Sequence, residues 1–259
     1  HVAQWGLDSC AVSAIGNDEL GDDIVRKFDE NGLNYRLERV DFPTGTVQVT
    51  LDENKVPSYN IMEGVAWDNI PMTPELEVLA RDCRAVCFGS LAQRSAVSRA
   101  TINAFIDMMP EDSLKIFDIN LRQHYYTEEI ICDSMKKADI LKINDEEILV
   151  VAQLLDVTEK SEREICKVLL DKFDLRMVIL TCGDRGSYVL TRDESSWVDT
   201  PKVSVVSTVG AGDSFTGTFI ASILLGKTLR QAHEAAVKVS AYVCTCQGAM
   251  PAIPKDLLV

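Results

Sequence analysis

The stretch Gly210-Ala211-Gly212-Asp213 combines a glycine-rich turn with a single acid. A helical period of apolar residues follows it and predicts a helix that begins near Asp213 and ends at Gly226; these apolar residues are Phe215, Phe219, Ile220, Ile223 and Leu224. A helix start leaves about four N–H groups unpaired with partial positive charge behind them, and glycines let an anion approach. The turn therefore suits a phosphate. Asp213 suits either a substrate proton or the helix cap itself.

Further polar clusters stand where strands are expected to end. Each is compatible with an ordinary cap or turn. Carboxyl ends of parallel strands meet at one edge of a sheet, however, so several in succession point to a single crevice. The clusters are Asp118, Asn120 and Arg122 after "LKIF", Asn144 and Glu147 after "ADILKI", and Gly183 and Gly186 after "MVILT".

The elements that must position these residues follow an alternating pattern. Helices are expected over residues 19–31, 95–109, 127–137 and 145–155. The intervening strand-like runs are nearly continuously apolar, as in a parallel sheet covered on both faces; they are "CAVSAIG", "RAVCFGS", "LKIFDIN", "ADILKIN", "LRMVILTCG" and "GSYVLT". The pattern predicts an α/β fold whose ligands bind beyond the carboxyl ends of the strands.

Residues 44–61 depart from this pattern because apolar and polar side chains alternate and the alternation breaks at "DENK". The alternation predicts a hairpin with Val47, Val49 and Leu51 on one face. The sequence leaves two interpretations open, a lid over the substrate and an ordinary surface hairpin.

Composition narrows the class of protein. The 259 residues, 46% hydrophobic and 25% charged, suit one large domain with a small appendage. A net charge of −14 argues against a nucleic acid partner. No run of about 20 apolar residues and no signal peptide occur, so no membrane association is expected. The eight cysteines form no CxxC and lie away from the three histidines, which favours reduced thiols in a cytoplasmic protein and argues against zinc.

Two motif-like stretches fail on inspection. "LLGKT" ends like a P-loop, but Ala221 occupies the position of the required glycine, and Thr228 with Gln231 predicts a helix capping box instead. "GAGDSFTG" is not GxGxxG, because Phe215 stands at the third glycine. A dinucleotide-dependent oxidoreductase is therefore disfavoured.

The stretch "TVGAGDSFTGTF" at residues 208–219 closely resembles the C-terminal signature of the ribokinase-like, or PfkB, family of sugar kinases. The resemblance extends over essentially the whole chain, through "DSCAVSAIGNDELGDDI", "PTGTVQV", "FDINLR", "LKINDEE", "LTCGDRGS" and "CQGAMPAIP". It implies a single domain over residues 1–259 with a three-layer α/β/α fold, a mostly parallel central sheet and a small β lid within about residues 40–66. "FGSLAQRS" and "FDINLR" look most like the fructokinase branch.

The resemblance implies a catalytic role for Asp213 as the base that accepts the sugar hydroxyl proton. It implies that the N–H groups of Gly210, Ala211 and Gly212 hold the transferring phosphoryl group. Phosphoryl transfer depends mainly on positioning and charge stabilisation, so an oriented acid beside a dipolar cradle is sufficient.

The resemblance also implies a nucleotide side and a sugar side of the site. Asn144 and Glu147 would organise Mg²⁺ and the phosphates, with Glu147 acting through water. The residues implied to line the nucleotide are Thr181, Gly183 and Gly186, and those implied to lie between sugar and phosphate are Asp118, Asn120 and Arg122.

Two features depart from the family pattern. The family usually has an aspartate at the position of Ser207, where it helps to hold a monovalent cation; serine lacks that charge, which argues against potassium activation. The family's first strand, with its sugar-binding acid and Gly-Gly segment, is not found before His1. We therefore expect either a true N-terminus upstream or an impaired activity.

The sequence thus predicts an ATP-dependent sugar kinase with Mg²⁺ as cofactor, fructose as the first choice of substrate, and a homodimer through the lid as one arrangement. Within the same family, 2-keto-3-deoxygluconate, ribose and nucleosides are the alternative substrates. A non-catalytic sugar or nucleotide sensor that kept the fold is the alternative from another class.

Overall fold

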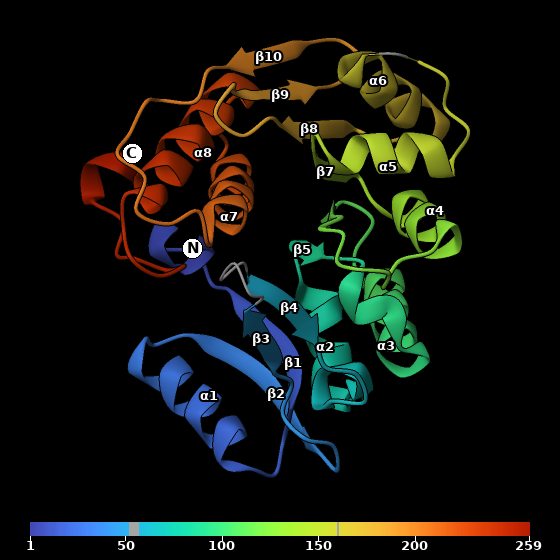
Figure 1. Cartoon of the computed structure of the whole chain (residues 1–259), viewed down its shortest axis with the longest axis vertical. Coiled ribbons are helices and arrows are strands. Elements are labelled where there is room, and N and C mark those ends of the chain that lie inside the picture. The colour runs from blue at the N-terminus through green and yellow to red at the C-terminus, as the bar shows by residue number, and fades with distance from the viewer. Residues whose placement is uncertain (52–56, 160) are drawn as a thin grey trace. The chain divides into compact units, whose positions relative to one another are not determined.

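The computed structural model describes residues 1–51, 57–159 and 161–259 (Figure 1). The chain divides into two compact units. Unit 1 comprises His1–Asp8, Ala85–Ser90 and Asp112–Val259, and unit 2 comprises Ser9–Arg84 and Leu91–Glu111. The "DENK" break of the expected hairpin lies outside the described residues. The prediction of one domain with a lid stays a prediction.

Unit 1 is built on a six-stranded sheet of order β10-β9-β8-β7-β6-β5. The four strands β5 to β8 are parallel, while β9 and β10 add to the edge in antiparallel pairs. The strands are β5 (Ala85–Phe88), β6 (Leu114–Asp118), β7 (Ile140–Asn144), β8 (Met177–Thr181), β9 (Ser187–Leu190) and β10 (Ser195–Val198). The mostly parallel sheet expected from the apolar runs is confirmed, except that the run "CAVSAIG" forms a strand of a separate two-stranded sheet in unit 2.

Helices cover both faces of this sheet and complete three layers (Figure 1). One face packs on α7 and α8 through Ile116, Ile140, Ile179 and Val189, which contact Phe215 and its neighbours in one buried cluster. On the other face, α4 follows β6, α5 follows β7 and α6 precedes β8, and each helix packs against that strand. The helices are α4 (Glu128–Lys137), α5 (Glu147–Leu154), α6 (Glu162–Lys172), α7 (Ala211–Leu224) and α8 (Leu229–Cys244).

The alternation of side chains along the strands explains where polar groups gather. In β7, Ile140 faces α7 and α8, and because successive residues alternate, Lys142 and Asn144 face the same way. The same spacing places Asp118 after Ile116 in β6 and Thr181 after Ile179 in β8. The face under α7 therefore changes from apolar to polar at the carboxyl ends of the strands.

Local sequence signals account for the helix ends. Thr228 and Gln231 form the predicted capping box at the start of α8. The expected helices at residues 127–137 and 145–155 are confirmed within two residues as α4 and α5. Gly226 takes a positive φ of 81° directly after Leu225, the C-cap of α7, so the predicted stop lies one residue too late.

A histidine is fully buried between β9, β10 and α8. His233 Nε2 lies 2.7 Å from Ser187 Oγ, and its Nδ1 lies 2.9 Å from Ser196 Oγ. Loss of hydration, followed by the charge of Arg230, lowers the pKa of His233 to about 4. The ring is therefore a neutral, hydrogen-bonded part of the core at neutral pH.

Unit 2 contains a parallel pair of strands joined by a helix. These elements are β1 (Cys10–Gly16), α1 (Glu19–Glu30) and β2 (Asn34–Val40). Asp18 caps α1 through Gly21 N and also accepts the N–H and the hydroxyl of Thr44, which lowers the pKa of its carboxyl group. This aspartate thus ties the start of α1 to the segment that leads into the hairpin.

The remaining helices of unit 2 surround an ion pair that is almost fully buried. Arg94 pairs with Asp68 at 2.8 Å and stacks over the Trp67 ring at 4.1 Å. These residues belong to or flank η2 (Ala66–Asn69) and η3 (Leu91–Arg94). The longer helices are α2 (Pro74–Asp82) and α3 (Ala96–Met108), the second of which confirms the helix expected over residues 95–109.

The hairpin predicted over residues 44–61 is present as β3 (Val47–Leu51) and β4 (Pro57–Ile61), paired antiparallel. Val47 and Val49 are 53% and 55% exposed. The apolar face of β3 is thus not buried in the core of its own unit at these two positions.

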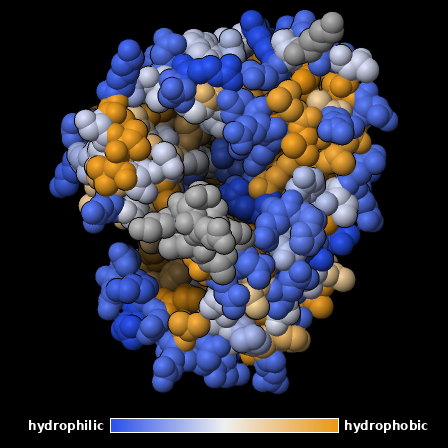
Figure 2. All heavy atoms as spheres, viewed as in Figure 1, coloured by the Kyte–Doolittle hydropathy of each residue, from blue (hydrophilic) through white to orange (hydrophobic). Residues whose placement is uncertain are grey.

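The surface seen in Figure 2 is mainly hydrophilic with smaller hydrophobic patches, in keeping with the net charge of −14. Among the described residues, no helix has both the length and the apolar character needed to cross a membrane.

Candidate active site

Helix α7 begins at Ala211, two residues earlier than the sequence suggested, with Gly210 as its N-cap. Gly210 has a φ of 83°, a conformation that favours glycine. A Cβ at this position would lie 2.4 Å from the carbonyl oxygen of Ala249. Glycine is therefore required here by its own backbone conformation and by the close approach of the Ala249 segment.

The N–H groups of the turn are only partly available to a ligand. The N–H of Ala211 donates to Thr208 O at 3.2 Å, and that of Ser214 donates to Gly210 O at 2.8 Å. Among the described residues, none accepts a hydrogen bond from the N–H of Gly212 or Asp213. The N–H of Ala211 closes the turn in this structure, whereas those of Gly212 and Asp213 are open; the implied contact of Ala211 with the phosphoryl group stays a prediction.

Asp213 occupies the third position of α7 and is exposed. In the described part of the chain, no side chain donates a hydrogen bond to its carboxylate. Asp213 is not the N-cap of α7 either, because Gly210 occupies that position. Asp213 is thus an exposed acid beside open N–H groups, and its charge also acts on the α-amino group of His1.

A buried ion pair lies on the α7 face of the sheet. Lys142 Nζ in β7 lies 3.0 Å from Asp118 Oδ1 in β6, and the two residues are direct partners in the strand register. The Thr216 hydroxyl lies 2.9 Å from Asp118 Oδ2 and 3.0 Å from the carbonyl oxygen of Gly212. Both carboxylate oxygens of Asp118 therefore have partners, and α7 is held to the sheet through them.

Lys142 also approaches the glycine turn itself. A Cβ built on Gly212 would lie 3.2 Å from Lys142 Nζ. Sequence reasoning missed both Lys142 and Thr216. Lys142 could have been found from its place inside the otherwise apolar run "ILKIN", because a buried lysine needs an acidic or polar partner.

Asn144 and Glu147 form a compact network at the end of β7. Glu147 is 8% exposed, and its Oε2 accepts the N–H of Asn144 at 3.0 Å while its Oε1 accepts the N–H of Leu121 at 2.9 Å. Asn144 Oδ1 accepts the N–H groups of Glu146 and Glu147 at 3.0 and 2.8 Å. The network links the loop after β6 to the start of α5.

This network suits Mg²⁺ only through water. In the residues that the structure describes, no three His, Cys, Asp or Glu side chains are grouped to hold a metal ion. Both oxygens of Glu147 already accept backbone N–H groups, although each keeps a lone pair for a water molecule. Mg²⁺ keeps several waters and binds mainly to substrate phosphates, so such an arrangement fits an ion that arrives with the nucleotide.

The loop after β6 presents Asn120 and Arg122 to solvent, whereas Asp118 is buried. Asn120 has a φ of 42° and Gln123 a φ of 48°, both in the left-handed region. Non-glycine residues in this region carry backbone strain and are frequent at functional sites. The loop is therefore a candidate for ligand contact. Its residues Asn120 and Arg122 are exposed, whereas Asp118 is buried.

The loop after β8 contains the predicted nucleotide residues. Thr181 ends β8 beside Asn144, its partner in the strand register. Gly183 and Gly186 follow, with φ values of 56° and 145°. Arg185, between them, pairs with Asp145 at 2.9 Å and with Glu162 at 3.1 Å, which fixes the loop to the starts of α5 and α6.

Ser207 lies just before the glycine turn. Its hydroxyl accepts the N–H of Val209 at 3.2 Å, and its own N–H donates to Cys244 O. The residue thus supports a local turn.

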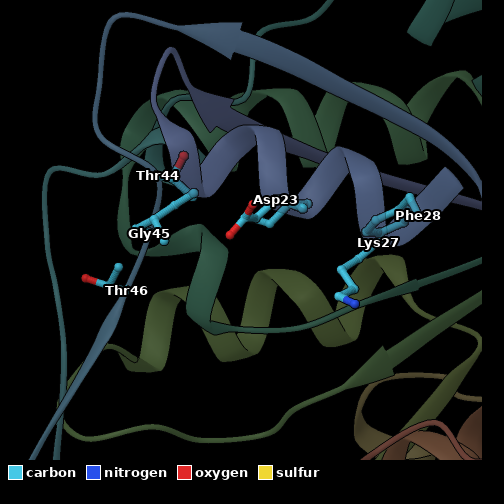
Figure 3. A pocket seen from close by; sticks show the side chains of 8 residues that line it. Asp23, Lys27, Phe28, Thr44, Gly45 and Thr46 are labelled. Atoms are coloured by element: carbon cyan, nitrogen blue, oxygen red, sulfur yellow. The ribbon is translucent and has the colours of Figure 1, made fainter. Parts of the chain in front are cut away.

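A pocket of about 360 Å³ lies in unit 2, between α1 and the segment Thr44–Thr46 (Figure 3). Its walls include Leu20, Ile24 and Phe28 from α1. None of the predicted site residues lines it. The concentration of polar groups in unit 1, rather than this pocket, therefore marks the candidate site.

The chain matches known proteins over nearly its whole length. Residues 1–256 match the family described as pfkB family carbohydrate kinase. An ATP-dependent 6-phosphofructokinase of Thermoanaerobacterium thermosaccharolyticum is 30% identical over 256 residues, 96% of this chain and 77% of that protein. Fructokinase-2 of Zea mays is 27% identical over 269 residues, 98% of this chain and 79% of that protein. Among solved structures, the fructokinase of Xylella fastidiosa with bound ATP superimposes with a TM-score of 0.86 at 20% identity, covering 99% of this chain and 86% of that one.

Proposed function

The chain belongs to the pfkB family of carbohydrate kinases, and from this premise we propose that it transfers the γ-phosphate of ATP to a sugar hydroxyl, with fructose as the first candidate. The observation that carries the proposal is the start of α7, where the exposed carboxylate of Asp213 stands beside the open N–H groups of Gly212 and Asp213. A helix start of this kind stabilises negative charge, and an unpaired acid can accept a proton.

In the proposed reaction, Asp213 takes the proton of the sugar hydroxymethyl group as its oxygen bonds to the γ-phosphorus. The bond between that phosphorus and the bridging oxygen breaks, and ADP leaves with the electron pair. The N–H groups of Gly212 and Asp213, with the turn held in shape by Gly210, stabilise the charge on the transferring group.

The other residues divide between the two substrates. We assign Thr181, Gly183 and Gly186 to the nucleotide, and the exposed Asn120 and Arg122 to the sugar side. When Mg²⁺ is bound with ATP, it supplies charge neutralisation of the phosphates. Asn144 and Glu147 would orient its water ligands, and Ser207 offers no charge to a monovalent cation.

Asp118 takes a different part from the one expected from the sequence resemblance. Because Asp118 is buried and pairs with Lys142 and Thr216, we assign it to holding these residues in place rather than to binding the sugar directly. The sugar-side contacts are then left to residues of the loop that follows.

A second acceptor has specific support. The relative at 30% identity is named a 6-phosphofructokinase, and the fructokinase described above is 27% identical. Fructose 6-phosphate, whose free hydroxymethyl group is chemically equivalent in this reaction, is therefore the alternative to free fructose.

The test is ADP formation from MgATP with the purified protein on a panel of fructose, fructose 6-phosphate, ribose, 2-keto-3-deoxygluconate and a nucleoside. The proposal expects the highest kcat/KM with fructose. A higher kcat/KM with fructose 6-phosphate selects the alternative acceptor. ADP formation at the no-sugar rate with every compound would favour a non-catalytic binding protein.

A further inference from the structure

Lys142 is a charged residue at the centre of a sheet. It belongs to β7, which pairs with β6 on one side and β8 on the other, and it is 8% exposed. The other residues of β7 are apolar apart from Asn144 at its end. Burying an ammonium group is unfavourable unless it is paired, so its presence demands a structural or a functional reason.

The surrounding residues hold the ammonium group in one place. Asp118 Oδ1 accepts from Nζ at 3.0 Å, and Asp118 is itself fixed by the Thr216 hydroxyl at 2.9 Å. An ammonium group has three donors, and among the described residues Asp118 is the one acceptor with which it forms a hydrogen bond. Donor capacity therefore remains after the ion pair has formed.

The position of Lys142 Nζ beside the glycine turn indicates which group its remaining N–H donors could bind. A Cβ at Gly212 would lie 3.2 Å from Nζ, closer than most real side-chain contacts. Gly212 itself is exposed and carries one of the open N–H groups. The glycine thus leaves room for the ammonium group beside the surface where an anion would bind.

Charge elsewhere in unit 1 strengthens this interpretation. Arg185 is paired with Asp145 and Glu162, and the Arg122 side chain is exposed, with Nη1 donating to the carbonyl of Leu121. The chain as a whole has a net charge of −14, which disfavours the approach of a nucleoside triphosphate. The Lys142–Asp118 pair is neutral overall, but its positive end lies beside the turn, where it would face the phosphates.

We propose that Lys142 is a further catalytic residue, whose ammonium group contacts the phosphoryl group during its transfer, with Asp118 and Thr216 as positioning residues. This inference rests on the proposed kinase function. Lys142 stabilises charge on the oxygens of the transferring group, while Asp213 remains the proton acceptor. The ion pair with Asp118 holds the ammonium group beside the turn before ATP arrives.

The test compares wild type with the double variant Lys142→Met/Asp118→Asn. It removes both charges, fills the space of the lysine stem and keeps an amide for the Thr216 hydroxyl, so no unpaired charge remains buried. Lys142→Gln is the second variant, because its amide can still donate to Asp118 after the charge is lost. Lys115→Met, at the opposite end of β6, is the control for loss of a strand lysine.

Two readouts are needed. The first is kcat and KM for ATP with the best sugar of the panel, together with the melting temperature. The second is the affinity for MgADP with and without fluoroaluminate, which mimics the planar phosphoryl group and requires no knowledge of the sugar. We expect both charge-removing variants to lose about 100-fold in kcat, as for removal of a single oxyanion-stabilising donor, with KM for ATP changed less than about threefold. The tightening of ADP binding by fluoroaluminate should also be lost.

A purely structural ion pair predicts otherwise. Whatever its melting temperature, the folded double variant would then keep kcat within about threefold and retain the fluoroaluminate effect, and this result would overturn the proposal. Wild type that phosphorylates no sugar would count against the kinase function, while the fluoroaluminate measurement would still decide the role of Lys142. Absence of any fluoroaluminate effect in wild type would also overturn the proposal.

Discussion

Glu147 Oε1, in the first turn of α5, accepts the N–H of Leu121 at 2.9 Å. These residues are 26 positions apart in the sequence, and the bond joins the loop after β6 to the start of α5. Because Glu147 Oε2 also accepts the N–H of Asn144, one buried carboxylate determines the backbone of two neighbouring loops. Its role is thus to shape the edge of the site, in addition to the water-mediated contact with Mg²⁺ that we propose.

Glu147→Gln should lower the stability of the fold and weaken the response to Mg²⁺. Gln presents an NH₂ group to one of the two backbone N–H donors, so one charge-assisted bond is lost, at a cost of about 2 kcal/mol in the free energy of unfolding. We also expect a higher Mg²⁺ concentration at half-maximal rate, with a smaller change in KM for the sugar. Urea unfolding and Mg²⁺ titration at fixed ATP measure the two effects. The control is Glu146→Gln, an exposed neighbour. An unchanged Mg²⁺ dependence in Glu147→Gln would remove the proposed metal role.

His233 makes stability depend on pH. Its pKa is about 4 in the folded protein and about 6.5 when unfolded, so the unfolded chain binds the proton more tightly. The free energy of unfolding should therefore fall as pH drops below about 6.5 and level off near pH 4. From pH 7.5 to 5 this group alone contributes a loss of about 2 kcal/mol. Urea titrations at the two pH values measure it.

His233→Gln is the comparison for that measurement. The amide cannot be protonated in this range, so the variant should lose about 2 kcal/mol less than wild type between pH 7.5 and 5, although it is less stable at pH 7.5. Equal pH dependence in both proteins would show that His233 is not the responsible group.

The sequence predicted six strands, β1 and β5 to β9, because these are short and largely apolar runs. It did not predict β2 or β10, whose segments "NYRLERV" and "SSWV" mix polar and apolar residues in a way that alternation alone does not distinguish from loop. These strands are identified only by their pairing with β1 and β9.

The sequence indicated the glycine turn of the candidate site but not the contacts between distant residues. The Gly210–Asp213 turn is contiguous, so its glycines and acid could be interpreted together. The partnership of Lys142 with Asp118 spans 24 positions and that of Asp118 with Thr216 spans 98. Such contacts depend on strand order and register, which a single sequence does not reveal. The contacts that Asp118 makes with Lys142 and Thr216 are therefore not visible in the sequence.

The hairpin offers a test of the predicted lid. Val49 is 55% exposed, so Val49→Lys should change the melting temperature by no more than about 2 °C. If the hairpin contributes to sugar binding or to a dimer, KM for the sugar should rise or the dimer should dissociate, as measured by kinetics and by light scattering. Val78→Lys, on α2 and 58% exposed, is the matched control. Unchanged KM and unchanged mass in Val49→Lys would leave β3 as an ordinary surface strand.

The central claim is that Asp213 is the catalytic base, and turnover by Asp213→Asn tests it most directly. The change is nearly isosteric but removes the proton acceptor, so kcat should fall at least about 100-fold while MgATP binding and the melting temperature stay close to wild type. Glu128→Gln, an exposed acid in the first turn of α4, is the control for a mere effect on the helix dipole. A kcat for Asp213→Asn within about threefold of wild type, like that expected for Glu128→Gln, would contradict the assignment.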